Sequence, residues 1–229
     1  MTVAIAVGRD LAPPVASDRR DPFVRLANLF DAGSVEPLYP ADTSGARVVR
    51  GTIDGRRAYA YCADGARMGG AIGDDAATHI VAAIDAAVRD RAPVIGVWHS
   101  GGAKLAGGVQ SFEGMGRMFV AMTRASGRVA QLSIVVGPAT GAAAYGPALT
   151  DLIVTCRTDR VFATGPDVVH GVLREELDLE PPGGTVAHGR PGVVRVTTDD
   201  ESEAYRLARG LVTLFSPPDG DASGEPRWS

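Results

Sequence analysis

Two short apolar segments, each followed by a glycine-containing turn, constrain the fold of this chain more than any other feature. The first is Val94–Trp98, which leads into the glycine loop 100–108, and the second is Leu132–Val136, which is followed by Gly137-Pro138. Continuous apolar runs of this length are typical of parallel strands whose two faces are both covered by helices. We therefore predict a parallel sheet packed between helices.

Helical patterns alternate with these strands. Apolar residues recur at helical spacing up to Arg91, before Pro93, and again from Phe112 to Ala125. Asp54-Gly55 separates two β-prone runs and favours a tight hairpin. Further helices are expected after Asp21-Pro22 and at about 200–215, and further strands at 152–155, 161–163 and 193–196. The alternation predicts an α/β fold.

The two ends of the chain differ in composition from the part between them. Residues 1–20 are rich in proline and arginine without a sustained period, so we expect a flexible arm, and the polar residues 216–229 are expected to form a disordered tail. The 229 residues, 45% of them hydrophobic, suffice for one large core. We interpret residues 21–215 as a single domain.

Several functional classes are disfavoured by composition. Lys and Arg total 23 against 27 Asp and Glu, and no basic run occurs, so nucleic acid is not an expected partner. No segment has membrane-spanning length and no leader sequence is evident, so we expect a cytoplasmic protein without a membrane partner. Cys62 and Cys156 lie far apart and follow apolar residues, which favours two buried thiols over a disulfide or a metal site.

The chemistry is expected where a strand ends and a glycine turn opens a helix, because backbone N–H groups are unpaired there. The candidate turns are His99–Ala103 and Thr140–Ala144. Together they offer two N–H donors to one oxygen and would stabilise an enolate or a tetrahedral oxyanion, for which each donor is typically worth about 3 to 4 kcal/mol. Spacing alone does not establish this role, since such turns commonly need glycine for backbone geometry only.

The order of several short segments resembles that in acyl-CoA carboxylase carboxyltransferase β chains. These segments are Asp54–Arg56, Gly69–Gly73, Ser100–Lys104, Gly146–Asp151 and Thr164–Val169. The similarity runs from about Asp21 to Phe215 and covers the N-terminal lobe of those two-lobed proteins. It implies a single-domain, crotonase/ClpP-like α/β fold, a spiral of ββα units, that binds an acyl-CoA and holds its enolate while the second lobe presents carboxybiotin.

The resemblance also implies roles for individual positions. The candidate catalytic backbone donors are Gly101, Gly102, Ala103, Gly141 and Ala142. The candidate substrate-binding residues are Gly69, Gly70, Lys104 and Ala143, and no metal ligand is expected. Side chains would contribute little acid or base chemistry, which agrees with the lack of an evident catalytic triad.

This chain departs from the family pattern at the first turn. His99 stands where the family usually has Asp, and Lys104 stands where it has Arg, without Arg's bidentate fork. Ala142 places a methyl group where a glycine often lies, which would narrow the thioester site. We expect His99 to have a structural role rather than to act as a general base, and Ser100 to resemble a nucleophile only superficially. Met115, Met118 and Met122 are expected in the core or at an interface rather than in a substrate channel.

Three functions follow as hypotheses. The leading one is the acyl-CoA-binding subunit of a split biotin-dependent carboxylase acting on acetyl-CoA or propionyl-CoA. Its expected partners are a C-terminal-lobe carboxyltransferase chain and a biotin carboxylase with its biotinylated carrier, in a hetero-oligomer that is hexameric in relatives. The alternatives are a subunit of a biotin-independent malonyl-thioester decarboxylase and a non-catalytic scaffold half, the latter suggested by altered residues such as Lys104, Ala106 and Gly107.

Overall fold

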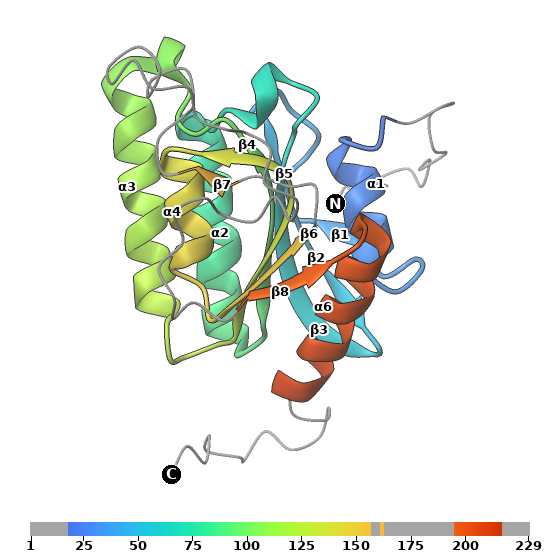
Figure 1. Ribbon diagram of the computed structural model, residues 1–229. Helices are drawn as coiled ribbons and strands as arrows, with labels where there is room; N and C mark the ends of the chain where they lie inside the picture. Colours follow the sequence, from blue (N-terminus) through green and yellow to red (C-terminus); the bar gives the residue numbers. More distant parts are fainter. Residues whose placement is uncertain (1–17, 157–160, 163–194, 217–229) are drawn as a thin grey trace, which may run out of the picture.

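The computed structural model describes residues 18–156, 161–162 and 195–216 of the chain (Figure 1). The predictions for most of the N-terminal arm, the C-terminal tail, and the segment Thr164–Val169 lie outside these residues. Within them, one mixed sheet carries helices α2, α3 and α4 on one face and α1 and α6 on the other (Figure 1). The predicted α/β architecture is confirmed.

The sheet has the strand order β1-β2-β3-β4-β5-β6-β8, and β7 pairs with β5 beyond the end of β6. β1, β2 and β3 are antiparallel to one another, whereas all later pairs are parallel. The strands are β1 Glu36–Pro37, β2 Ala46–Ile53, β3 Arg56–Ala63, β4 Val94–Ser100, β5 Gln131–Thr140, β6 Leu152–Cys156, β7 Val161–Phe162 and β8 Arg195–Thr198. The predicted hairpin joins β2 to β3, and its two turn residues, Asp54 and Gly55, both have positive φ.

The helices follow their predicted patterns, and α1 and α6 each begin at an aspartate cap. They are α1 Pro22–Leu29, α2 Asp74–Asp90, α3 Gly108–Ala125, α4 Ala142–Ala148 and α6 Glu201–Phe215, with short 3₁₀ turns η1 Met68–Gly70 and η2 Leu105–Gly107. The Asp21 carboxylate accepts a hydrogen bond from the N–H of Phe23, and that of Asp200 accepts one from Glu203, each over 2.8 Å. α2 ends where Arg91 adopts a left-handed conformation, two residues before Pro93.

Two apolar cores lie on opposite faces of the sheet. Met115, Met118 and Met122 are buried in the core beneath α2 and α3, as predicted. Cys62 and Cys156 are buried thiols in the core beneath α1 and α6, also as predicted. Phe112, by contrast, does not belong to the buried stripe of α3. Its side chain is 57% exposed because it lies on the solvent side of the first turns of that helix.

The ends of two strands were predicted wrongly: β8 extends to Thr198 rather than Val196, and β5 is longer than expected. We expected the second buried strand to end before Gly137-Pro138, but β5 continues to Thr140. The pairing of β4 with β5 shifts here, from Trp98 opposite Val135 to Ser100 opposite Ala139. Such an irregularity accommodates a proline inside a strand, since its missing N–H is not required by the ladder at that point.

None of the helices in the described part of the chain is long and apolar enough to cross a membrane. Nor do the described His, Cys, Asp and Glu side chains form a group of three or more that is suited to a metal ion.

Candidate functional site

The two glycine turns leave the same edge of the sheet because β4 and β5 are adjacent and parallel. β4 runs into the turn that contains Gly101 and Gly102, and β5 runs into Gly141, which precedes α4. The carboxyl ends of parallel strands are where ligands bind in many α/β proteins. The fold therefore brings the two predicted turns to one place.

The turns are in direct contact at Gly102. Its φ is +95°, and a Cβ added to it would lie 2.9 Å from the Thr140 carbonyl oxygen and 3.6 Å from the Ala142 nitrogen. A side chain at this position would be strained by the backbone conformation and crowded by the second turn. Gly102 is thus the point at which the backbone of the first turn meets that of the second.

A third segment, Gly69–Ile72, which includes the end of η1, packs its backbone against the first turn. The Gly101 N–H donates to the Gly69 carbonyl over 2.9 Å. Ile72 makes two further hydrogen bonds of 2.8 Å each: its N–H donates to the Gly102 carbonyl, and its carbonyl accepts from the Lys104 N–H. Gly70 has φ +73°, and a Cβ there would overlap the His99 carbonyl oxygen. Gly69 and Gly70 were predicted to bind substrate, and the structure places their backbone against the turn.

The amides of the first turn differ in whether they are paired. The Gly101 N–H is bonded to Gly69, and the Gly102 N–H donates to the buried Ser100 Oγ over 3.1 Å. The Ala103 N–H donates to no atom of the described residues. Of the three predicted donors in this turn, Ala103 is therefore the one whose N–H is not engaged by another described residue.

The second turn leaves two amides unpaired within the described structure. Ala142 and Ala143 begin α4, so their N–H groups have no partner inside the helix, whereas the Ala144 N–H bonds to the Gly141 carbonyl over 2.9 Å. Gly141 has φ +55°, and the space beside its Cα is open. The Ala143 side chain is buried in the core, so only its backbone faces the turn.

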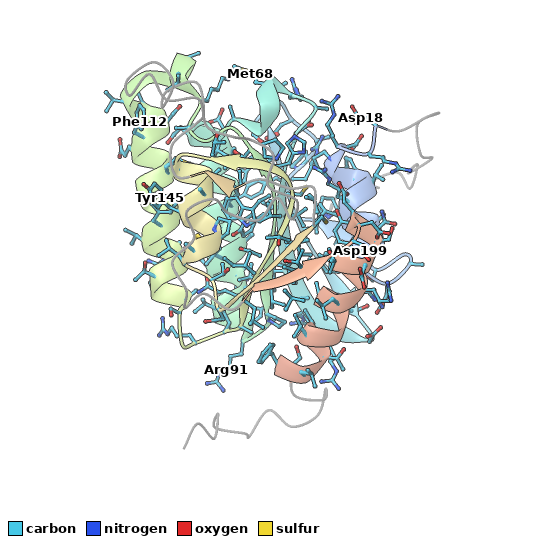
Figure 2. The ribbon with its side chains drawn as sticks, viewed as in Figure 1. Asp18, Met68, Arg91, Phe112, Tyr145 and Asp199 are labelled. Atoms are coloured by element: carbon cyan, nitrogen blue, oxygen red, sulfur yellow. The ribbon has the colours of Figure 1, made fainter. Side chains whose placement is uncertain are left out.

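Ser100 is fully buried, and its hydroxyl oxygen accepts the Gly102 N–H. This agrees with the prediction that it only superficially resembles a nucleophile. The Lys104 side chain lies along Gly73, where an added Cβ would be 3.4 Å from its Cδ. Met68 and Phe112 lie near this end of the molecule, and Tyr145 projects from α4; all three side chains are more than half exposed (Figure 2).

The segment Gly146–Asp151 anchors the second turn to the sheet. A Cβ on Gly146 would overlap the Trp98 indole. The indole N–H donates to Ser133 Oγ over 2.9 Å, and the Thr150 hydroxyl lies 3.0 Å from the same oxygen. These contacts fix α4 against the end of β4, which accounts for a glycine and a threonine at these positions.

His99 lies behind the first turn and is half-buried. Its ring is packed between Gly65 and Gly137, and its Nδ1 is 3.3 Å from Arg25 Nη2. Burial, followed by the positive charge of Arg25, lowers the pKa of His99. A neutral ring that accepts a hydrogen bond in this position fits a structural role, as predicted. Sequence reasoning missed Arg25. The one feature that could have indicated its role is a charged residue directly before the buried Leu26 of α1.

The comparisons with known proteins agree with this architecture. Residues 21–227 match the Carboxyl transferase domain family. The chain is 50% identical over 211 residues to the biotin-dependent acetyl-/propionyl-coenzyme A carboxylase beta6 subunit of Mycobacterium tuberculosis, covering 92% of this chain and 43% of that protein. It is 36% identical to the methylmalonyl-CoA decarboxylase subunit alpha of Veillonella parvula, covering 82% of this chain and 40% of that one.

A solved structure of the transcarboxylase 12S subunit, with methylmalonyl-coenzyme A and methylmalonic acid bound, superposes with a TM-score of 0.77 at 32% identity, over 84% of this chain and 41% of that one. The predicted crotonase/ClpP-like α/β fold is confirmed by this likeness. The chain spans less than half the length of each of these relatives. On the family match and on the identity to the carboxylase β subunit, the chain belongs to the carboxyl transferase domain family.

Proposed function

We propose that this chain binds an acyl-CoA thioester, acetyl-CoA or propionyl-CoA, where its two glycine turns meet, and that it forms the acyl-CoA-binding half of a biotin-dependent carboxyltransferase. The observation that carries the proposal is the meeting of the turns at Gly102, with N–H groups at Ala103 and Ala142 that are unpaired within the described part of the chain. Two unpaired amides close together favour an oxygen that gains negative charge.

In this proposal the donors are the amides of Ala103 and Ala142. Gly101 and Gly102 shape the first turn, because their own N–H groups already have acceptors. Gly141 shapes the second turn through its positive φ. The Ala143 N–H is the alternative donor in that turn, since it is also unpaired.

The chemical requirement is stabilisation of an enolate. Removal of a proton from the carbon next to the thioester carbonyl places negative charge on the carbonyl oxygen. Hydrogen bonds from fixed backbone N–H groups are stronger to that oxygen than to the neutral carbonyl, so they lower the barrier. Biotin, held covalently by a separate carrier, would supply the carboxyl group and the base. We assign no acid or base role to a side chain of this chain.

The proposed partners follow from the length of the relatives. The matched relatives are more than twice as long as the matching segment, and the transcarboxylase 12S subunit assembles as a hexamer. We propose that a C-terminal carboxyltransferase lobe acts with this one and presents the biotin of a carrier charged by a biotin carboxylase. The assembly would be a hetero-oligomer.

The test is binding followed by reconstitution. Calorimetric titration with propionyl-CoA and with coenzyme A measures whether the acyl group contributes to binding, and transfer of labelled carboxyl groups is then measured with the second lobe and a carboxylated biotin carrier. We expect saturable binding and transfer that depends on all components. Absence of thioester binding to the complete assembly would overturn the proposal and favour a scaffold half.

A second candidate is decarboxylation of a malonyl-type thioester. It is favoured by the 36% identity to the methylmalonyl-CoA decarboxylase subunit alpha and by the shared enolate that results when CO₂ is lost. Incubating the assembly with malonyl-CoA or methylmalonyl-CoA in the absence of biotin separates the two. Release of CO₂ under those conditions supports decarboxylation as the activity.

A further inference from the structure

A buried arginine joins the two strands that end in the glycine turns. Arg25, on α1, is 2% exposed. Its Nη2 donates to the Val136 carbonyl of β5 over 2.9 Å and to Glu201 Oε1 of α6 over 2.9 Å, and it lies 3.3 Å from His99 Nδ1 of β4. One nitrogen of the guanidinium group therefore contacts both central strands and a helix far away in the sequence.

These contacts occur at the irregular point of the sheet, two residues before Gly101 in β4 and four residues before Thr140 in β5. Between the pairs Trp98–Val135 and Ser100–Ala139, β4 advances by two residues and β5 by four. His99 and Val136 lie within this step. A bulge interrupts the regular ladder, so something other than strand pairing has to define the local geometry. Arg25 supplies bonds to both sides of it.

The histidine at this point cannot easily move. A Cβ on Gly65 would lie 2.6 Å from His99 Cγ, and one on Gly137 would overlap the ring. The ring thus occupies space that a side chain at Gly65 or at Gly137 would need. Since Gly101 follows His99 by two residues, a shift of the ring would be transmitted directly to the first turn.

The burial of Arg25 costs the folded state free energy. A buried guanidinium group loses hydration, and Arg25 Nε and Nη1 have no hydrogen-bond partner among the residues that the structure describes. The Glu201 carboxylate, whose side chain is 34% exposed, provides the one ionic partner for the charge among the described residues. A well-packed apolar side chain would avoid the desolvation cost. Stability alone therefore does not account for a cation here, whereas its directed hydrogen bonds to both strands would serve the geometry of the site.

We infer that Arg25 is a positioning residue that sets the relative placement of the two glycine turns, and through them the separation of the Ala103 and Ala142 amides. The inference rests on the proposed function for its catalytic consequence. Its structural part, the ordering of both turns, is independent of any substrate.

The experiment compares Arg25→Lys with a matched control, Arg209→Lys. Arg209 also joins α6 to α1, through the Leu29 carbonyl and Asp31, but it contacts the β2–β3 hairpin and neither glycine turn. Lysine keeps the charge in both variants and lacks the planar set of donors that contacts several acceptors at once. The free energy of unfolding is measured first for both variants, so that local effects on the turns can be separated from a loss of global stability.

Amide hydrogen exchange then provides a readout that needs no partner. We expect Arg25→Lys to raise exchange about tenfold or more at the hydrogen-bonded amides of the two turns, those of Gly101, Gly102 and Ala144, relative to Arg209→Lys. Exchange that rises equally across the whole sheet, or that does not differ between the two variants, overturns the inference. This outcome is readable even if the chain binds no acyl-CoA.

Kinetics of the reconstituted assembly test the catalytic consequence. Misplacement of the amide donors should lower kcat about 100-fold in Arg25→Lys, with KM for the acyl-CoA changed less than about threefold, because the donors act mainly in the transition state. Arg209→Lys should keep kcat. An unchanged kcat in Arg25→Lys, in an assembly whose wild type is active, overturns the positioning role while leaving the proposed function intact.

Discussion

Replacement of Gly102 by alanine tests the central geometry of the site most directly. The added methyl group would lie 2.9 Å from the Thr140 carbonyl oxygen, closer than a carbon atom normally approaches, and 3.6 Å from the Ala142 nitrogen. The backbone there has φ +95°, which disfavours any residue with a Cβ. The methyl group therefore both strains the first turn and pushes it away from the second.

The expected magnitudes differ for stability and for catalysis. A non-glycine residue in a disfavoured positive-φ conformation costs on the order of 1 to 3 kcal/mol. Loss of one amide donor to the enolate oxygen costs about 3 to 4 kcal/mol of transition-state stabilisation, which corresponds to a decrease in kcat of about 10²- to 10³-fold. Gly102→Ala should therefore remain folded and lose nearly all carboxyl transfer.

Gly116→Ala is the matched control. Gly116 is exposed on α3, and a Cβ there would have no neighbouring atom within 4 Å. Alanine in a helix is favoured over glycine by up to about 1 kcal/mol, so this variant should be at least as stable as the wild type and fully active. Unfolding in urea and carboxyl transfer in the reconstituted assembly are measured for both. Wild-type kcat in Gly102→Ala would refute the convergence of the two turns on one oxygen.

Three further outcomes are expected. Ser100→Ala leaves the buried Gly102 N–H without its acceptor and should lower the free energy of unfolding, measured in urea, by about 1 to 3 kcal/mol. The variant should keep residual transfer activity, and complete loss of activity in a stable variant would instead indicate that Ser100 is a nucleophile. Folding lowers the pKa of His99 from 6.5, so the unfolded chain binds more protons and the free energy of unfolding should fall as the pH decreases below about 6.5. His99→Gln should flatten this part of the pH profile of unfolding, and an unaltered profile would contradict a lowered pKa of His99. Met118→Ala should cost about 2 to 5 kcal/mol by leaving a cavity in the core, whereas Val120→Ala, on the exposed side of the same helix, should stay within about 0.5 kcal/mol in thermal unfolding; equal effects would contradict the orientation of α3.

The sequence by itself determined the framework that carries the site. The continuous apolar run in β4 predicted a strand covered on both faces, and the helical spacing of Met115, Met118 and Met122 predicted which face of α3 is buried. Asp54-Gly55 predicted the hairpin because few dipeptides adopt positive φ at both positions. These features depend on local periodicity and backbone preference, which are properties of neighbouring residues.

The tertiary structure alone decided which amides of the turns are free. The Gly101 N–H is occupied by Gly69, which lies some thirty residues earlier in the chain, and no local pattern reveals that bond. The continuation of β5 past Pro138 likewise depends on the bulge opposite β4. Arg25 reaches this bulge from α1, more than 70 residues earlier in the chain than His99, because folding packs α1 and α6 against the same face of the sheet. The turns were predictable from sequence because they depend on neighbouring residues. The N–H donors that they leave free were not, because hydrogen-bond partners are set by spatial proximity.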